Sequence, residues 1–292
     1  MLFRSNSGTG NDLNVLSGSG TKIISGGNIK MGNASSTAFK INCIIPVYNF
    51  EMNSTGNATL LSMFTINNLL TFTNGKITTG SNKVIIPLGG SITGASSGKY
   101  VNGFLEKSIP ASATNVTFEI GCPTNYGPVK LSFNGTTNGS GSITAKCIST
   151  DHPDIANSGI DNAKSVNRYW MLTNSNVSGF TSFDAIFNFN NPADVDAGLN
   201  TSAVVIRMRL GSVWFSTNAG ALTTNSSQAL AVSDFGDFQI GEPTGLPLIT
   251  CSTVNATTAT GCSGVVNFAM TSTSIPSPVI TYSQNPGRIF NV

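Results

Sequence analysis

One region of the chain gathers side chains that could act together in a chemical site. His152 is the only histidine, and it lies upstream of Arg168, Tyr169 and Trp170 in "NAKSVNRYWMLTNS". An imidazole, a guanidinium, a phenol and an indole held close together could form a catalytic or binding site. Such a group requires elements that bring the four side chains to one place, so the interpretation depends on the secondary structure around them.

The stretch around Trp170 is typical of a long β-strand, and this favours a structural interpretation. Strand alternation puts Arg168 and Trp170 on one face and Tyr169 on the other. We expect Trp170 to fill a sandwich core, as mid-strand tryptophans do. Arg168 would then start on the core side and either reach the rim or pair with an acid such as Asp161 or Asp184. His152 belongs to the preceding loop rather than to this strand.

Hydrolysis by a Ser-His-Asp triad is not expected. The only possible histidine base, His152, has Asp151 and Asp154 as neighbours. Adjacent residues of an extended segment point in opposite directions, so these neighbours are poor triad partners. No GxSxG sequence precedes a helix. We expect His152 to be an exposed loop residue without a catalytic role.

Glycoside hydrolysis and polysaccharide cleavage are also not expected. A glycosidase needs two carboxylates about 5 to 9.5 Å apart in a cleft. The chain has only 13 acidic residues, mostly isolated in turns. Glu106, Glu119, Asp184 and Glu242 could converge only through the tertiary structure. A lyase would need several Lys, Arg, His or Asp residues along a groove, and no such set is evident.

Calcium is the cation that the sequence could hold best. Asp194 and Asp196 in "NPADVDAGLN" supply alternating oxygens on one side of a loop, with Asn190 or Asn191 nearby. Calcium takes 6 to 8 oxygen ligands from such flexible loops. The spacing is not that of an EF-hand, and the alternative is that both aspartates only form turns. Apart from possible calcium, no cofactor is expected.

Carbohydrate binding is open on the sequence alone. Protein sites for sugars use exposed aromatic rings beside amides. Trp214 lies on a short predicted strand, "GSVWFST", next to Phe215, and Tyr126 lies in a loop. We consider Trp214 a candidate ligand-binding residue. The alternative is that it packs in the sandwich core.

Composition indicates an all-β protein from outside the cell. Hydrophobic residues make up 39% of the 292 residues and charged residues only 10%, against about 25% in ordinary domains. Abundant Gly, Asn and Thr indicate strands joined by tight turns. The net charge is +2, with the basic residues scattered, so no nucleic-acid surface is expected. No apolar run approaches the roughly 20 residues of a membrane helix, and we expect that the start of an exported precursor is missing.

Five cysteines are present, and none forms a CxxC pair, so zinc and thioredoxin-type sites are not expected. Cys251 and Cys262 flank a Gly/Thr-rich turn and are candidates for a disulfide. Cys122 and Cys147 each lie beside a predicted strand and are a second candidate pair. Cys43 would then be a buried, small apolar residue.

The spacing of apolar runs and turn residues divides the chain into three regions. Residues 1–105 contain short strands that end on Gly, Asn or Ser, which favours a parallel β-solenoid over a β-meander. Residues 106–243 contain about eight longer strands at the spacing of an antiparallel β-sandwich. Residues 244–292 contain about three strands, too few for a complete immunoglobulin-like domain.

Three segments resemble parts of known extracellular proteins. "VYNFEMNSTGNATLLSMFTINNLLTFTNGKITTGSNKVII" resembles β-solenoid stretches of large surface proteins secreted by Bacteroidetes-type bacteria. The region from "YVNGFLEKSIP" to "FGDFQIGE" looks like the sandwich module that follows in such proteins. "ITC", "GCSGVVNF" and "ITYSQNPGRIFNV" are similar to the first half of a hyalin repeat, an immunoglobulin-like module, so 244–292 would be a partial repeat.

The resemblance implies a non-catalytic structural or adhesive module of a bacterial surface or secreted protein. Its partners would be other surface proteins, glycans or copies of itself. Two alternatives are a carbohydrate-binding module and a fibre subunit. In the fibre, the C-terminal sheet would be completed by a strand from another chain.

Overall fold

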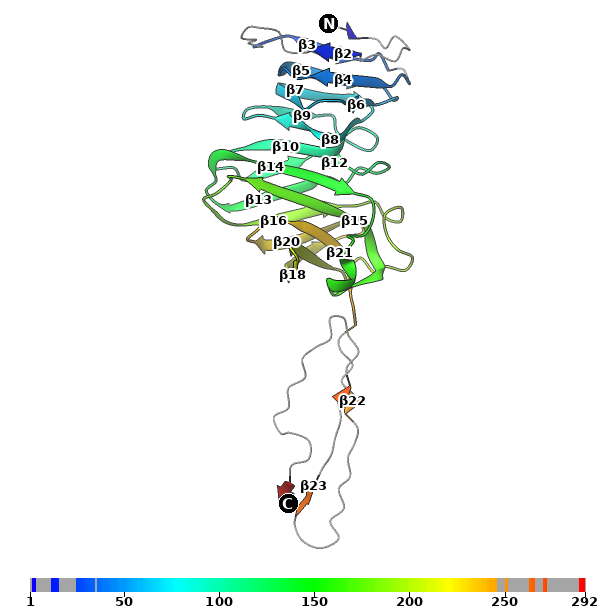
Figure 1. Ribbon diagram of the computed structural model, residues 1–292, viewed down its shortest axis with the longest axis vertical. Coiled ribbons are helices and arrows are strands. Elements are labelled where there is room, and N and C mark those ends of the chain that lie inside the picture. The colour runs from blue at the N-terminus through cyan, green and yellow to red at the C-terminus, as the bar shows by residue number, and fades with distance from the viewer. Residues whose placement is uncertain are drawn as a thin grey trace.

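The computed structural model describes residues 2–3, 12–15, 25–34 and 36–245, together with the short strands 250–251, 263–265, 270–271 and 289–291. These residues form an all-β protein with an N-terminal β-solenoid and an antiparallel region that follows it (Figure 1). Within the described residues, a single 3-10 turn, η1 (Ile155–Asn157), interrupts the strands. The predicted fold class is therefore confirmed.

The N-terminal half is a parallel β-solenoid of about four turns over residues 28–121. Each strand pairs in parallel with the equivalent strand of the next turn, as β3 with β5 and β5 with β7. The solenoid, rather than a meander, is confirmed. Its strands, with two short ones before them, are β1 (Leu2–Phe3), β2 (Leu13–Val15), β3 (Asn28–Met31), β4 (Phe39–Cys43), β5 (Val47–Asn53), β6 (Ala58–Leu60), β7 (Phe64–Asn74), β8 (Ile77–Ile86) and β9 (Ser91–Thr93).

Parallel pairing aligns like residues of successive turns into columns. Met31 pairs with Met52, and Met52 pairs with Phe72, and all three side chains are buried. A column of amides forms outside this core: Asn49 Nδ2 donates to Asn28 Oδ1 at 2.6 Å, and Asn68 Nδ2 donates to Asn49 Oδ1 at 2.7 Å. Because each turn buries its apolar side only against its neighbours, the core and the amide column together fix the register.

Glycine is required at one solenoid corner by both backbone conformation and space. Gly75 has a φ of +78°, and a Cβ there would lie 1.8 Å from the carbonyl oxygen of Ser54. Gly80 also has a positive φ, of +59°, but a Cβ there would meet nothing within 4 Å. The two positions therefore separate the cost of a left-handed backbone from the cost of a clash.

We expect Gly75→Ala to destabilise the protein more than the matched control Gly80→Ala. The control should lose about 1 to 2 kcal/mol, the cost of a left-handed non-glycine residue. Gly75→Ala should lose a further 1 to 3 kcal/mol, because the backbone must move to admit the methyl group. Urea unfolding of both variants measures the difference. Equal losses would show that the corner at Gly75 relaxes freely.

Strand β10 (Val101–Ala111) joins the solenoid to the sandwich. It pairs in parallel with β8 and with β12 (Ile120–Gly121), and in antiparallel with β14 (Asn138–Ile148). The hydrogen-bonded sheet therefore continues from the last solenoid turn into the sandwich without a break. The predicted boundary at residue 105 falls inside this strand.

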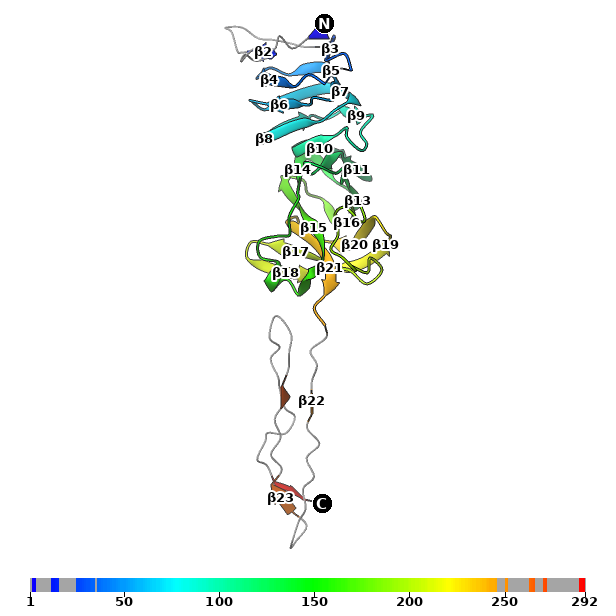
Figure 2. The same cartoon turned by 90° about the vertical axis from the view of Figure 1, so that its right-hand side faces the viewer.

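The second half is a sandwich of two antiparallel sheets (Figure 2). One sheet continues from β14 through β15, β21 and β17 to the edge strand β18, and the other has the order β11-β13-β16-β20-β19. Aromatic rings join the two sheets. The ring centroid of Phe187 lies 5.1 Å from that of Trp170 and 4.8 Å from that of Phe238. The remaining strands are β11 (Asn115–Phe118), β13 (Val129–Gly135), β15 (Ile160–Ser175), β16 (Phe180–Asn188), β17 (Val205–Leu210), β18 (Val213–Ser216), β19 (Asn218–Leu222), β20 (Ser226–Val232) and β21 (Asp237–Pro243).

Four short strands belong to the predicted C-terminal region. β22 (Thr250–Cys251) pairs with β24 (Met270–Thr271), and β23 (Ser263–Val265) pairs with β25 (Ile289–Asn291), both in antiparallel. Cys262 lies outside the described residues, so its pairing with Cys251 stays a prediction. The partial hyalin repeat over 244–292 also stays a prediction.

Candidate functional site

Strand β15 separates the residues of the expected cluster onto two faces. Val166, Arg168 and Trp170 all lie at 0% exposure on the inner face, which confirms the predicted alternation. Tyr169 points to the other face, where His152 packs against it at 4.8 Å between ring centroids. The four side chains therefore form two separate sites, one inside the sandwich and one outside it.

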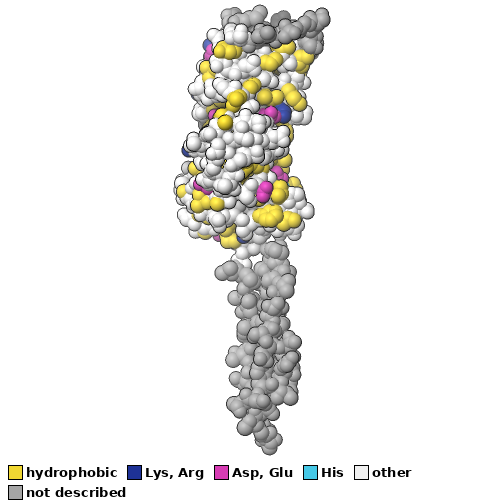
Figure 3. All heavy atoms as spheres, turned by 90° about the vertical axis from the view of Figure 1, so that its left-hand side faces the viewer, with side chains coloured by type: hydrophobic (Ala, Val, Ile, Leu, Met, Phe, Trp, Pro, Cys, Tyr) yellow, Lys and Arg dark blue, Asp and Glu magenta, His cyan; other side chains and the backbone are white. Residues whose placement is uncertain are grey.

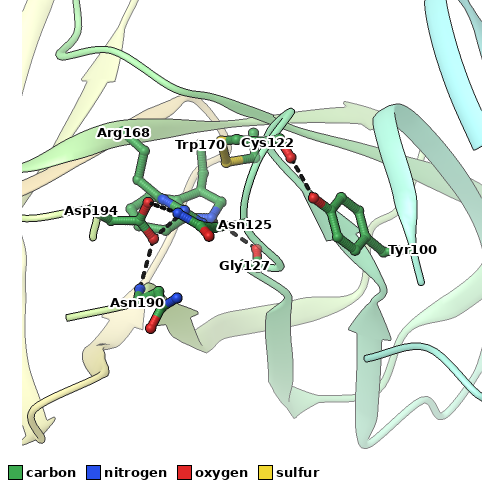
Figure 4. The surroundings of a disulfide bond; sticks show 9 residues. Tyr100, Cys122, Asn125, Gly127, Arg168, Trp170, Asn190 and Asp194 are labelled. Atoms are coloured by element: carbon green, nitrogen blue, oxygen red, sulfur yellow. Dashed lines mark hydrogen bonds and ion pairs between the residues drawn. A yellow bond between two sulfur atoms is a disulfide. The ribbon is translucent and has the colours of Figure 1, made fainter. Parts of the chain in front are cut away.

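On the inner face, Arg168 is held by a buried carboxylate (Figure 4). Its Nη2 forms an ion pair with Asp194 Oδ2, and the same oxygen accepts the backbone N–H of Asn190 at 2.7 Å. Asp194 Oδ1 accepts from Asn125 Nδ2 at 2.6 Å. The prediction that Arg168 can pair with an acid is therefore confirmed, but Arg168 does not reach the rim and the acid is neither Asp161 nor Asp184, since the loop after β16 brings Asp194 to it instead.

Trp170 fills the core beside this pair, as expected. Its indole N–H donates to the carbonyl oxygen of Gly127 at 3.2 Å. A Cβ on Gly127 would lie 2.0 Å from Arg168 Nη1. Only glycine thus lets the loop between β12 and β13 pass so close to the buried guanidinium.

The two aspartates of the predicted calcium loop are occupied by protein groups. Both oxygens of Asp194 accept hydrogen bonds, and its charge is balanced by Arg168. Asp196 Oδ2 accepts the backbone N–H of Ser165 at 2.8 Å. A calcium ion would have to displace Arg168 from Asp194. Across the described part of the chain, no group of three or more His, Cys, Asp or Glu residues could hold a metal ion.

A disulfide lies next to the buried ion pair (Figure 4). It joins Cys122 to Cys147, one of the two pairs expected from the sequence, with 5.3 Å between the Cα atoms. The bond ties the loop after β12 to strand β14. Cys43 is a free buried cysteine, as predicted; burial raises the pKa of its thiol, which donates to the carbonyl oxygen of Ile45.

On the outer face, His152 is buried rather than exposed, so the expectation of an exposed loop histidine is wrong. Only 6% of it is accessible, because its ring packs between Tyr169 and Trp214, 4.9 Å from the latter. Nδ1 accepts the backbone N–H of Asp154 at 3.0 Å, and Nε2 lies 3.2 Å from Asp237 Oδ2. The backbone donor assigns the proton to Nε2, which then donates to Asp237.

This arrangement differs from that of a catalytic base. In a Ser-His-Asp triad one ring nitrogen faces the aspartate and the other faces the nucleophile. Here Asp237 holds one nitrogen of His152, and the backbone of Asp154 holds the other. No nitrogen is left to accept a proton from a nucleophile, so the contacts of His152 serve to anchor its loop to the sheet.

Trp214 lies on the same outer face and not in the core. It sits opposite Arg209 in the pairing of β17 with β18 and is half-buried. Its indole N–H donates to the backbone oxygen and to Oδ2 of Asp154, each at 3.1 Å. Hydrogen bonds from Asn157 and then Arg209 hold the pKa of Asp154 below its usual range. The alternative of core packing for Trp214 is therefore wrong, and its role in ligand binding stays a prediction.

The four acids considered for glycoside hydrolysis each have their own partner. Glu106 forms an ion pair with Lys83, and Glu119 forms one with Lys107 at 2.6 Å. Burial raises the pKa of Glu119. The other two, Asp184 and Glu242, accept the backbone N–H groups of Ala231 and Asn200.

Asp151 is a partly buried acid that could make stability depend on pH. Its Oδ1 accepts from Ser165 Oγ at 2.6 Å and from Gln239 Nε2 at 3.4 Å. Burial raises the pKa of Asp151 above its ordinary value. As the pH rises, the folded protein therefore keeps the proton on Asp151 to a higher pH than the unfolded chain does. This disfavours the folded state as the pH rises through the ordinary carboxyl range, and the effect is complete above the folded pKa.

We expect Asp151→Asn to gain stability relative to the wild type as the pH rises from 3 to 7. The asparagine oxygen can still accept from Ser165, but the buried group no longer ionises. Urea unfolding at several pH values measures the difference between the two proteins, with Asp234→Asn as a control for removing one exposed charge. A difference that shrinks with rising pH would contradict the expectation.

One further surface site was not expected from the sequence. Ser97 of the solenoid and Tyr126, Asn188, Asn190 and Asn225 of the sandwich line a pocket of about 410 Å³. These residues are up to 128 positions apart, from Ser97 to Asn225. Of them, the sequence singled out Tyr126 as a loop aromatic and Asn190 as a calcium ligand, but no spacing pattern joins the five.

Comparisons of the chain with known protein families, with curated proteins and with solved structures found no match. The similarity to Bacteroidetes-type surface proteins and to hyalin repeats therefore stays a prediction. No helix in the described ranges is long and apolar enough to cross a membrane.

Proposed function

We propose that the chain is a non-catalytic structural and adhesive module of a secreted or cell-surface bacterial protein. The observation that carries this proposal is the pairing of β10, which is parallel to β8 and antiparallel to β14. Backbone hydrogen bonds thereby run from the solenoid through the sandwich in one sheet. Such a continuous sheet suits a stiff spacer that presents a binding surface away from its attachment point.

The side chains that could react are already bonded to other protein groups, which supports a role without catalysis. The buried Arg168 is paired with Asp194, and both ring nitrogens of His152 are engaged. Figure 3 shows one face of the molecule on which uncharged groups predominate and charged side chains are few. A surface of this kind offers hydrogen bonds and apolar contacts to partners rather than charge-based recognition.

The disulfide supports a location outside the cytoplasm. Disulfides persist in secreted and surface proteins and are reduced in most cytosols. Cys122–Cys147 lies where the solenoid meets the sandwich, so it reinforces the junction through which a load would pass. Extracellular surface proteins, glycans or other copies of the chain are the partners that fit this role.

Two measurements on the full chain test the proposal. Pulled by its ends without reductant, the solenoid and sandwich should unfold in one event that frees ~67 nm of chain, at ~3.5 Å for each residue outside the loop that the disulfide keeps closed. Beads coated with the protein should be retained under flow on surfaces bearing extracellular glycans or proteins, and beads coated with unfolded protein should not. Separate unfolding of the two halves would contradict the structural role, and no retention on any surface would contradict the adhesive role.

Self-assembly by strand addition is a second candidate, which one edge of the sandwich favours. Among the described strands, β18 pairs only with β17, and its side chains Val213 and Phe215 are 53% and 44% exposed. An uncharged apolar edge strand is a template for another strand. Phe215→Lys should abolish concentration-dependent association in sedimentation velocity. Deletion of the residues after Leu246 tests the alternative in which another chain completes the C-terminal sheet. A monomer at all concentrations would exclude both.

A further inference from the structure

The pocket at the junction of the solenoid and the sandwich has the features of a binding site. Its volume of about 410 Å³ lies within the range of small-ligand pockets, which occur preferentially between domains. Ser97 comes from the solenoid hairpin at 96–99, Tyr126 from the loop after β12, and Asn225 from the turn between β19 and β20. Three separate elements thus converge on one cavity.

Packing against the ring of Tyr100 fixes the position of Tyr126. Its ring lies 5.6 Å from that of Tyr100, at an interplanar angle of 30°. Tyr100 is completely buried and donates its hydroxyl to the carbonyl oxygen of Cys122 at 2.7 Å. Because Cys122 is in turn held by the disulfide, the ring of Tyr126 is presented on a rigid support.

The amides of the pocket are also held in place. Asn188 Nδ2 donates to the carbonyl oxygen of Pro128 at 2.9 Å. The backbone N–H of Asn190 donates to the buried Asp194, so the ion pair with Arg168 fixes the start of this loop. The exposed side-chain amide of Asn190 and the hydroxyl of Tyr126 form no hydrogen bond with any described residue. Two polar groups of the pocket are therefore available to a ligand.

The lining of this pocket carries no charged side chain. It combines hydroxyl and amide groups with the ring of Tyr126. Amides and hydroxyls both donate and accept, which matches the hydroxyl groups of a sugar, and an aromatic face covers its C–H groups. Burial raises the pKa of Tyr126 to about 12, and a tyrosine hydroxyl is a donor at neutral pH even at its ordinary pKa of about 10.

A neighbouring cavity lined by lysines indicates that the ligand of the Tyr126 pocket is uncharged. That cavity of about 500 Å³ also contains Ser97, but Lys76 and Lys99 line it. An anionic ligand would find its countercharge there and not beside Tyr126. The Trp214 region is a weaker candidate, because its indole N–H is already bonded to Asp154.

We propose that the junction pocket binds a neutral saccharide, with the ring of Tyr126 as its stacking platform and the Tyr126 hydroxyl and the Asn190 side-chain amide as its hydrogen-bonding groups. This inference names the ligand class for the adhesive role proposed above and rests on it. The two can fail separately. Beads that are retained only on protein surfaces, with no glycan binding, would overturn this site and leave the adhesive role intact.

The test uses the full chain on an array of neutral oligosaccharides of glucose, galactose, mannose and N-acetylglucosamine, beside uronate- and sialate-containing ones. We expect binding to neutral oligosaccharides of the array. Calorimetry then measures the affinity for the oligosaccharide that binds most tightly. Tyr126→Ala should weaken it about tenfold, since the ring contact and one hydrogen bond are lost. Tyr126→Phe and Asn190→Ala should each weaken it about threefold to tenfold.

The controls are Trp214→Ala and Lys99→Ala, which should leave the affinity within about twofold of the wild type. Tyr126→Phe keeps the packing on Tyr100, so its effect is independent of any folding defect in Tyr126→Ala. Binding to acidic glycans alone, lost with Lys99→Ala, would overturn the proposal. Binding lost with Trp214→Ala and kept by Tyr126→Ala, or no binding to any glycan, would do the same.

Discussion

Asp194→Ala is expected to destabilise the protein by about 3 to 5 kcal/mol, because it leaves the buried charge of Arg168 without a partner. Arg168 is completely buried, and its Nε and Nη1 have no hydrogen-bond partner among the described residues. Asp194 is thus the main compensation for the guanidinium charge. The loss should appear as a lower urea midpoint with an unchanged slope.

A double-mutant cycle separates this charge from the other contacts of Asp194. Arg168→Met removes the charge and keeps apolar volume beside Trp170. We expect Arg168→Met/Asp194→Ala to be more stable than Asp194→Ala alone, since no unpaired charge remains. Single effects that simply add would show that the two side chains are not coupled. Such a result would contradict the interpretation of the pair as mutually dependent.

The second large effect is expected from removing the disulfide. Cys122 and Cys147 close a loop with a sequence separation of 25, for which the chain-entropy relation gives about 3.5 kcal/mol. Cys122→Ala/Cys147→Ala should lose about this amount of unfolding free energy. The loss should be measured by urea unfolding without reductant.

Cys43→Ala is the matched control, because it removes a buried cysteine and keeps the disulfide. It should lose only about 1 kcal/mol. Adding a thiol reductant should then destabilise Cys43→Ala by the amount that the double variant has already lost, and should leave the double variant unaffected. Sensitivity of the double variant to reductant would contradict the assignment of the effect to this bond.

The two faces of β15 show how far the sequence could predict the candidate sites. Alternation correctly placed Arg168 and Trp170 inside and Tyr169 outside, since side-chain direction in a strand follows from local geometry. The same alternation could not identify Asp194 as the partner of Arg168, or bring Asp237 to His152 across 85 positions. Those contacts depend on which strands pair and on where the intervening loops lie.

The fold itself was largely determined by the sequence. Short apolar runs that end on Gly, Asn or Ser predict stacked strands with tight corners, because these residues accept the backbone conformation of a corner. The change to longer alternating runs near Glu106 predicts the sandwich. Both are local signals, with a period of two residues along each strand, and they do not require knowledge of distant contacts.

Only the tertiary structure decided which side chains meet. The pocket that unites Ser97, Tyr126 and Asn225 exists because β10 carries the sheet from the solenoid into the sandwich and sets the two halves end to end (Figure 1 and Figure 2). His152 is buried because β18 places Trp214 over it. Local alternation determines faces, whereas sites arise from the register and packing of strands that are far apart in the chain.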